Sequence, residues 1–242
     1  MHPQNPTPAD RCGPAPYMVK PRYLAGPCDQ VPVITGSNWQ QQRVPGLGTA
    51  YGTAYLRCDE ATGSHYLALH TPGTEEHPAR LACDGMPVGW EFLGYPAAGH
   101  LPSWRVIFSP GTPPELPAAL AGLLSADEEP VPHEVTDAGE ATAPLEAAGW
   151  IRDLGHECSW FSPGDQQAAV VTPTSPANPT REEQSWLLAA RNRDRDEALW
   201  LTQATPQTPT ALIRALCAQL ADPTPVPRHH KPGTGPVTVI RP

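Results

Sequence analysis

Apolar and polar residues alternate along several short segments of the chain, and this period of two predicts β-strands. In residues 89–95 the alternation places Trp90 and Phe92 on one face, with Glu91 on the other. Turn-forming glycine, proline and aspartate residues separate the segments. The pattern predicts strands over residues 50–58, 64–70, 89–95, 103–108, 150–153, 157–161, 167–172, 185–191 and 198–204.

Two segments carry apolar residues at helical spacing, which predicts amphipathic helices. Each follows a Thr-Pro pair, so we expect Thr112 and Thr208 to be N-caps and the next proline to take the first helical position. Glu115 adds a capping box to the first helix. Pro117 lies deeper, where its missing N–H would lose a hydrogen bond, so we expect a kink or a later helix start there. Residues 144–148 predict one or two further helical turns, ending at Gly149.

The two helices belong to a longer internal repeat. Residues 104–124 (WRVIFSPGTPPELPAALAGLL) and 200–220 (WLTQATPQTPTALIRALCAQL) align without a gap at an offset of 200 − 104 = 96. The same offset pairs Trp90 with Trp186, and a weaker match places HTPG at 70–73 over FSPG at 161–164. We therefore expect an α+β protein of two tandem repeats, each an antiparallel strand meander followed by a C-terminal amphipathic helix packed on the sheet.

Changes in composition along the chain predict its division into segments. Residues 127–142 are acidic and poor in large apolar side chains, as in an interdomain linker, whereas the ends of the chain are rich in proline. The predicted order is a flexible Pro-rich N-terminus (1–20), a first repeat module (21–126), an acidic linker (127–142), a second repeat module (143–222) and a Pro-rich basic tail (223–242).

The net charge and the lengths of the apolar runs indicate which cellular compartment and which binding partners to expect. The formal net charge of −9 opposes binding to a polyanion, because nucleic-acid binding normally needs a basic face. Residues 1–22 lack an apolar run of signal-peptide length, and the longest aliphatic stretch, 118–124, is too short for a membrane span. We expect a cytoplasmic protein with no membrane association, whose oligomeric state the sequence leaves open.

The candidate chemistry is sparse. The six cysteines are spread along the chain without a C-x-x-C pair, so we expect reduced, mostly buried thiols, and neither a disulfide framework nor a zinc site. His65, His70 and His77 lie close together, but no carboxylate or cysteine shares their spacing. We therefore predict no metal, no cofactor and no catalytic residues.

Aromatic and arginine side chains are the remaining candidates for contact with a partner. Trp90, Trp104, Trp186 and Trp200 recur at matched positions beside aliphatic neighbours, so we interpret them as core residues rather than stacking platforms. The predicted hairpin tip at 192–197 mixes arginines with acidic residues, which favours a solvated tip. The residues predicted to contact a partner or nucleic acid are Tyr51, Tyr55, Tyr66, Arg191, Arg193 and Arg195.

Four segments carry a resemblance to a known family. They are PRYLAG at 21–26, AAGW at 147–150, WFSPGD at 160–165 and TPTALIRALCAQLADPTPVPR at 208–228. The chain resembles the actinomycete SPDY-domain family, a domain of unknown function that usually occurs in tandem, over most of residues 21–228. In its Ser-Pro-Asp core, Ser162, Pro163 and Asp165, a glycine is inserted at 164, and residues 29–79 match poorly. The resemblance implies a bacterial cytoplasmic protein and brings no catalytic residues with it.

Three functions remain in competition. We expect a non-catalytic protein-binding adaptor, because the chain is duplicated and lacks a recognisable active-site pattern. The alternative is a single-stranded nucleic-acid-binding protein, in which Tyr51, Tyr55 and Tyr66 would stack on bases. That alternative is disfavoured by the net acidic charge. A third hypothesis is an enzyme with an unrecognised site, which needs geometry rather than sequence order to detect.

Overall fold

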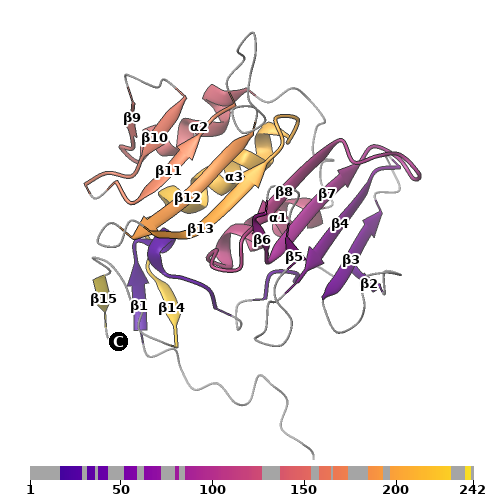
Figure 1. Cartoon of the computed structure of the whole chain (residues 1–242), viewed down its shortest axis with the longest axis horizontal. Coiled ribbons are helices and arrows are strands. Elements are labelled where there is room, and N and C mark those ends of the chain that lie inside the picture. The colour runs from indigo at the N-terminus through magenta and orange to yellow at the C-terminus, as the bar shows by residue number, and fades with distance from the viewer. Residues whose placement is uncertain are drawn as a thin grey trace, which may run out of the picture.

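The fold is built on a ten-stranded antiparallel sheet with strands from both halves of the chain (Figure 1). In the computed structural model the described residues are 17–28, 32–35, 38–42, 52–58, 63–71, 80–81, 85–126, 137–153, 158–164, 166–173, 185–192, 197–229 and 238–240. Within them the sheet runs in the order β2 (Gln40–Gln42), β3 (Thr53–Cys58), β4 (His65–His70), β7 (Trp90–Tyr95), β8 (Trp104–Phe108), β13 (Glu197–Ala204), β12 (Trp186–Asn192), β11 (Ala168–Val171), β10 (Ser159–Phe161) and β9 (Ile151–Arg152). All nine predicted strands are present, with ends that differ from the prediction by three residues or fewer.

The described residues also form three α-helices, and the α+β class is confirmed. They are α1 (Glu115–Ser125), α2 (Ala138–Ala147) and α3 (Thr210–Ala221), and they cover one face of the sheet (Figure 1). Phe92 and Phe108 from the strands pack with Leu120 of α1 and Leu216 of α3 in one hydrophobic cluster. That cluster contains strand residues from both halves, so the sheet and the core are continuous across the chain.

The halves meet at the β8–β13 pair in the middle of the sheet. Ile107 lies opposite Gln203, and the flanking pairs are Val106 with Ala204 and Phe108 with Thr202. The hydrogen bonds at the two ends of this pair are reciprocal. The N–H of Ser109 donates to the carbonyl of Leu201 (2.9 Å), and the N–H of Thr205 donates to the carbonyl of Arg105 (2.9 Å).

The strand order contradicts the weaker sequence match of 70–73 with 161–164. His70 ends β4, which pairs with β7. Phe161 ends β10, which pairs with β9 and β11 and is separated from β12 by β11. β7 and β12 correspond in the repeat, since Trp90 and Trp186 are 96 residues apart. The neighbour of β7 is β4 and the neighbour of β12 is β11, so β4 corresponds in position to β11 and not to β10.

Both helices of the repeat begin later than predicted. The residue before α1 is Pro114 and the residue before α3 is Pro209, and neither helix has a side-chain cap. Thr112 and Thr208 instead lie in the preceding turns, where their hydroxyls approach those of Ser109 (3.4 Å) and Thr205 (3.3 Å). The N-cap and capping-box predictions are thus wrong. The later start places Pro117 in the first turn of α1, where a missing N–H loses no bond, as expected.

The ends of the described chain are more ordered than the prediction of a loose terminus and an extended tail. β1 (Tyr17–Lys20) lies between β14 (Val226–Arg228) and β15 (Thr238–Ile240), so residues from 1–20 and 223–242 form a second sheet. The short 3-10 helix η2 (Arg22–Leu24) follows β1. A small sheet of β5 (Arg80–Leu81) and β6 (Pro87–Val88) was also missed. Figure 1 shows β1, β14 and β15 below the lower ends of β12 and β13.

The linker prediction is wrong in its second part. α2 begins at Ala138, inside the segment assigned to the linker, and the Asp137 side chain caps it by accepting the N–H of Glu140 (3.0 Å). The helix ends at Ala147, followed by Gly149 with a φ of 75°, so the predicted stop is confirmed. Residues 127–136 lie outside the described part of the chain.

Most of the repeated tryptophans are core residues, as predicted. Trp104, Trp186 and Trp200 are buried, whereas Trp90 is half-buried. Among the described residues, no helix has the length and apolar character needed to span a membrane.

Candidate functional site

A cavity of about 340 Å³ opens between α2 and the last strands of the large sheet. We call it the edge cleft. Its lining combines aromatic rings, hydroxyls and one side chain of each charge. The lining residues are Ala138, Gly139, Thr142, Glu146, Trp150, Arg152, Trp160 and Thr172.

Two indole rings form the wall of the edge cleft on the sheet side. Trp150 and Trp160 are 6% and 8% exposed, so a ligand would meet only part of each ring. Trp150 packs edge-on against Tyr23 of η2, with ring centroids 6.1 Å apart, which holds it in the core. Arg152 is the cross-strand neighbour of Trp160, and its guanidinium carbon lies 5.8 Å from the Trp160 ring centroid. That contact stacks a cation on an aromatic face at the mouth of the cleft.

The opposite wall is the face of α2. The Thr142 hydroxyl donates to the carbonyl of Ala138 (2.8 Å), so this side chain is satisfied within its own helix. Glu146 is exposed one turn further along and supplies a carboxylate opposite Arg152. The mouth therefore carries one cation and one anion beside aromatic surface, an arrangement that suits an amphipathic ligand more than a polyanion.

The edge cleft lies beside the last strand of the sheet. β9 pairs with β10 on one side and is the final strand in the order of described strands. Ile151 in β9 is 47% exposed and lies across from Phe161, on the face away from the cleft. A sheet edge presents backbone N–H and C=O groups in extended geometry, which is a template for pairing with another chain.

Ser162, Pro163 and Gly164, from the segment that carries the family resemblance, lie in a turn after β10. Ser162 is buried between β10 and β11, and its hydroxyl accepts the N–H of Ala168 (3.1 Å). The N–H of Ser162 in turn donates to the carbonyl of Ala168 (2.9 Å). Gly164 has a φ of 82°, which a residue with a Cβ rarely adopts. This segment shapes the hairpin, and its serine is a structural residue.

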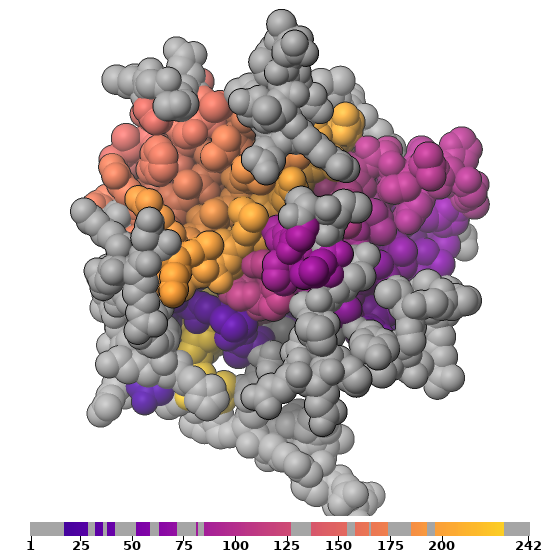
Figure 2. Space-filling model, viewed as in Figure 1, coloured from indigo at the N-terminus to yellow at the C-terminus, as the bar shows by residue number. Residues whose placement is uncertain are grey.

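A second hollow lies on the other face of the sheet, at the junction of the halves. It measures about 560 Å³ and is lined by Gly85, Met86, Pro87, Ser109, Pro110, Gly111, Ala198, Leu199, Trp200 and Leu201. Met86 and Val88 of the β6 region pack there against Ile107 of β8. Figure 2 shows this segment lying over the strands from both halves. The described lining carries no charged side chain, so we interpret the hollow as a packing groove.

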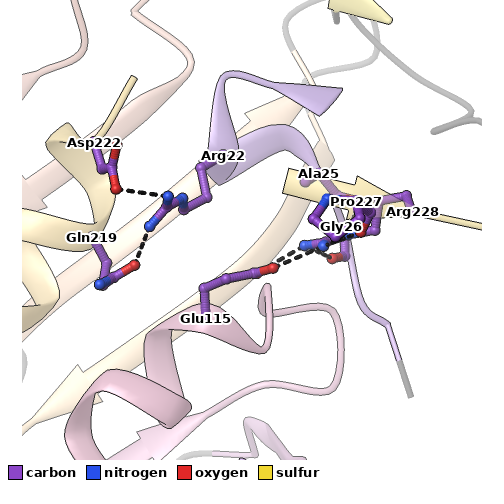
Figure 3. Close-up of polar contacts among 8 residues, drawn as sticks. All are labelled: Arg22, Ala25, Gly26, Glu115, Gln219, Asp222, Pro227 and Arg228. Carbon is purple, nitrogen blue, oxygen red and sulfur yellow. Dashed lines mark hydrogen bonds and ion pairs between the residues drawn. The ribbon is translucent and has the colours of Figure 1, made fainter. Parts of the chain in front are cut away.

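A polar cluster joins the two ends of the chain to the helices, and we call it the terminal clasp (Figure 3). Arg228 is buried and donates to both carboxylate oxygens of Glu115, each at 2.8 Å. Its remaining N–H groups donate to the carbonyls of Ala25, Gly26 and Pro227. Because every donor of this guanidinium has a partner, the pair is a structural bridge and not a site with spare bonding capacity.

The other part of the terminal clasp holds the end of α3. Arg22 forms an ion pair with Asp222 (2.6 Å) and donates to Gln219. Partial burial, the largest single contribution, acts to raise the pKa of the Asp222 carboxyl. Hydrogen bonds from Thr224 and the Arg22 guanidinium together outweigh burial and leave that pKa below its usual value. Figure 3 shows both arginines reaching toward the helices from the terminal segments.

The structure separates the six predicted contact residues. Tyr66 is buried against Trp104, so the prediction that it stacks on a ligand is wrong. Tyr55 is half-buried and stacks on Trp90 with centroids 6.2 Å apart. Arg191 is exposed near the end of β12. Tyr51, Arg193 and Arg195 lie outside the described residues.

The described cysteines and histidines form no metal site. The Nδ1 of His65 lies 3.0 Å from the Sγ of Cys58, but no group of three metal-binding side chains occurs in the described segments. The expectation of mostly buried thiols is wrong for these segments, because Cys58 is exposed and Cys28 and Cys158 are half-buried. Cys217 is buried, and burial raises the pKa of its thiol to about 12.

The comparison with protein families bears on the second half of the chain. Residues 161–226 match the family model of SPDY, a domain of unknown function. The match covers about a quarter of the chain, so it identifies a segment of the second half that is similar to the SPDY domain. The matched segment begins one residue after Trp160 and takes in β11, β12, β13 and α3. Of the residues that line the edge cleft it includes Thr172, whereas Trp150, Arg152, Trp160 and the lining residues of α2 lie outside it. No curated protein matches the chain, and no solved structure matches it.

Sequence analysis did not find the edge cleft as a site. Trp150 and Trp160 are visible only within the segments that resemble the SPDY family, and Arg152 and Glu146 belong to no motif. The cleft forms because α2 packs on α3 and so lies opposite the sheet edge. No local pattern in the sequence encodes that contact.

Proposed function

We propose that the chain arose by tandem duplication of one strand-and-helix module, extending the SPDY domain to residues outside the matched range. Three observations support this. The repeated segments are offset by 96 residues, the order of strands is matched on either side of the central pair, and that pair is reciprocal in its register. The two copies would then be joined edge to edge about a local twofold axis near Ile107 and Gln203.

We further propose that the protein is a non-catalytic adaptor that binds an extended segment of another protein at β9 and the edge cleft. The observation that supports this is the position of an aromatic, charge-bearing cleft directly beside the edge strand of the sheet. Strand addition uses backbone hydrogen bonds for affinity and neighbouring pockets for side-chain specificity. The two features are therefore complementary parts of one peptide-binding site.

Size and charge define the ligand. A cavity of about 340 Å³ holds one or two large side chains and lies at the small end of ligand sites. Arg152 and Glu146 flank its mouth, so the segment would carry a large apolar side chain between polar or oppositely charged neighbours. The small area explains why such binding would be transient, in the weak class of protein interfaces.

The chemistry of the lining supports binding over catalysis. The described residues that line the edge cleft include no cysteine and no histidine, and the single carboxylate, Glu146, is exposed. A nucleophile or general base usually works with a hydrogen-bonded histidine, cysteine or second carboxylate, and the described lining residues include none of these beside Glu146. Nucleic-acid binding remains the alternative, and the net charge of −9 with one arginine at the mouth opposes it.

A peptide-display selection tests the adaptor proposal. We expect a random dodecapeptide library on phage to yield binders for the full chain, and hydrogen exchange with the strongest synthetic peptide to protect β9. Ile151→Arg adds charge and bulk at the exposed edge and should weaken that peptide by roughly ten-fold or more. Leu101→Arg is the matched control, because Leu101 is 86% exposed elsewhere on the surface, and it should bind like the wild type.

Two results would overturn the adaptor proposal. One is a selection that enriches no peptide, and the other is a set of peptides whose affinity is the same for wild type and Ile151→Arg. A parallel anisotropy titration with fluorescein-labelled dT20 examines the alternative. Salt-dependent binding to that oligonucleotide would favour a nucleic-acid-binding protein instead.

A further inference from the structure

The edge cleft has a counterpart at the opposite end of the sheet. Gln41 pairs with Tyr55 across β2 and β3 as Arg152 pairs with Trp160 across β9 and β10. The indole preceding each edge strand also matches, because Trp39 lies two residues before Gln41 as Trp150 lies two before Arg152. Both ends of the sheet thus carry aromatic residues at matching positions, one in the second strand from the edge and one just before the edge strand.

The next strands extend the correspondence and give an independent check. Tyr55 pairs with Ala68, which pairs with Phe92. On the other side, Trp160 pairs with Val170, which pairs with Leu188. Phe92 and Leu188 differ by 188 − 92 = 96 residues, the offset found in the sequence repeat. Strand register and sequence therefore agree on which positions correspond.

The counterpart is a row of half-buried aromatic rings. The ring of His70 stacks on Trp90 at 4.2 Å between centroids and 16° between planes, and Tyr55 stacks on the same indole at 6.2 Å and 25°. All three side chains are half-buried, so part of each ring is open to solvent. We call these three residues the aromatic row.

Core residues of the sheet fix the position of the aromatic row. Trp90 stacks on the buried Phe92 at 6.0 Å, and Phe92 in turn meets Trp39 edge-on at 6.5 Å. The Nε1 of Trp39 donates to the Ser125 hydroxyl (2.6 Å), which ties the edge of the sheet to the end of α1. Rings with so many fixed neighbours lose little freedom when a ligand binds.

The main difference between the two ends is charge. Gln41 and Arg152 are both exposed and occupy matching positions, so an uncharged side chain replaces a cation at this end. All three residues of β2 are glutamine. An uncharged edge beside open aromatic rings suits a proline-rich segment, because prolines present apolar rings on a preformed, extended helix that aromatic-lined surfaces recognise.

We propose that the aromatic row is a second binding site, for a proline-rich segment in the polyproline II conformation, which would make the adaptor bivalent. This inference rests on the proposed function, because it treats both sheet edges as binding sites. Seven strand intervals of about 4.8 Å separate β4, in the middle of the aromatic row, from β9, so the two sites lie roughly 34 Å apart along the sheet. The protein would hold two separate segments of its partners at that spacing.

A crossed pair of variants tests the second site without the first. The probe is fluorescein-labelled deca-proline, followed by anisotropy with the full chain. Tyr55→Leu keeps an apolar side chain for packing and removes the ring, and we expect it to weaken deca-proline by about five-fold or more, given the energy of one aromatic contact. Ile151→Arg should leave deca-proline binding unchanged, and Tyr55→Leu should leave the selected edge-cleft peptide unchanged.

The outcomes are distinguishable. If Tyr55→Leu loses deca-proline binding while Ile151→Arg and the wild type keep it, the second site is supported, even if the selection finds no edge-cleft peptide. No binding of deca-proline to the wild type at millimolar concentration, or equal binding to wild type and Tyr55→Leu, overturns it while leaving the edge-cleft proposal standing. Thermal unfolding of each variant identifies loss of fold, and if Tyr55→Leu unfolds, His70→Leu replaces it with the same expectation.

Discussion

In the first half of the sheet the indole of Trp104 faces Gly94 across β7 and β8, whereas in the second half Trp200 faces Ala190 across β12 and β13. A Cβ on Gly94 would lie 2.1 Å from Cε2 of Trp104, so the indole occupies the space that a methyl group would fill. The Nε1 of Trp200 donates to the carbonyl of Tyr23 (2.8 Å), while the buried Nε1 of Trp104 has no partner among the described residues. The indole of Trp104 thus lies against Gly94, at a position that an alanine occupies in the second half.

The residues at the ends of α1 and α3 also differ between the two halves. Glu115 begins α1 and is bridged by Arg228, but the position 96 residues later is Ala211, which offers no carboxylate. At the other ends, Asp222 follows α3 and binds Arg22, whereas Ala126 follows α1. The buried aromatic and aliphatic positions are kept in both halves. The carboxylates that bind the chain ends are not, because each of them, Glu115 and Asp222, has an alanine at the matching position of the other half.

The largest expected effect comes from breaking the terminal clasp with Arg228→Ala. The change leaves the carboxylate of Glu115 without its buried partner and three backbone carbonyls without a donor, so we expect a loss of about 4 kcal/mol in the free energy of unfolding. Urea denaturation followed by tryptophan fluorescence measures it.

The matched control for the clasp is Arg214→Ala. Arg214 and Glu140 form an exposed pair at 3.4 Å, and removing an exposed pair costs about 0.5 kcal/mol or less. Equal losses in the two variants would show that the clasp contributes no more than a surface ion pair.

Exchanging the small residues opposite the tryptophans gives the next effect. Gly94→Ala forces a methyl group into the Trp104 ring, and overpacking of this kind costs about 3 kcal/mol at its upper range. Ala190→Gly, the reverse change in the second half, adds backbone freedom and a small void and should cost about 1 kcal/mol. Thermal and urea unfolding measure both, and a neutral Gly94→Ala would mean that the indole moves freely.

Replacing the tryptophans themselves sharpens the comparison of their Nε1 groups. Both Trp104→Phe and Trp200→Phe remove buried ring atoms, but only the second removes a hydrogen-bond donor from a buried carbonyl, that of Tyr23. We expect Trp200→Phe to be more destabilising by about 1 kcal/mol, the cost of leaving one buried acceptor unsatisfied. If the order is reversed, the Trp200 hydrogen bond contributes less than the difference in packing.

Local pattern was sufficient for most of the fold. Alternation predicted every strand of the large sheet except β2, whose three glutamines carry no apolar face. The helical stripes were also correct, because Leu116 and Leu120 in α1 and Leu212 and Leu216 in α3 are buried. The helix starts were wrong because Thr-Pro is equally compatible with a turn, and in the structure Thr112 makes a local contact with Ser109, three residues before it, within such a turn.

The site depended on contacts that sequence does not encode. Trp150 directly precedes β9 and Arg152 lies in it, but the cleft exists only because α2 lies opposite them. Likewise, Tyr55 could be named as a contact residue, while its stacking on Trp90 depends on strand register. The terminal strands were missed because β14 is a short, proline-containing segment, Val226–Arg228, stabilised by pairing with residues about 200 positions away.

The smallest expected effect is the pH dependence of the Arg22–Asp222 pair. Hydrogen bonds from Thr224 and the Arg22 guanidinium hold the pKa of Asp222 below the usual aspartate value of about 3.9. A carboxyl whose pKa is lower in the folded state stabilises the fold above its unfolded pKa, and this stabilisation is lost as the pH falls through the folded pKa. The side chain is one-third exposed, so we expect a contribution of only about 0.5 to 1 kcal/mol.

Urea unfolding of wild type and Asp222→Asn at pH 6 and at pH 3 isolates this pair, because the other carboxyl groups are common to both proteins. The wild type should be the more stable protein at pH 6, and the difference should shrink at pH 3 as Asp222 becomes protonated. In an Arg22→Gln background the difference should shrink at pH 6 as well, because the cation is absent. A difference that stays constant with pH in both backgrounds would assign the role of Asp222 to its hydrogen bond with the Thr224 N–H (2.8 Å) alone, leaving the end of α3 without an electrostatic contact to the N-terminal segment.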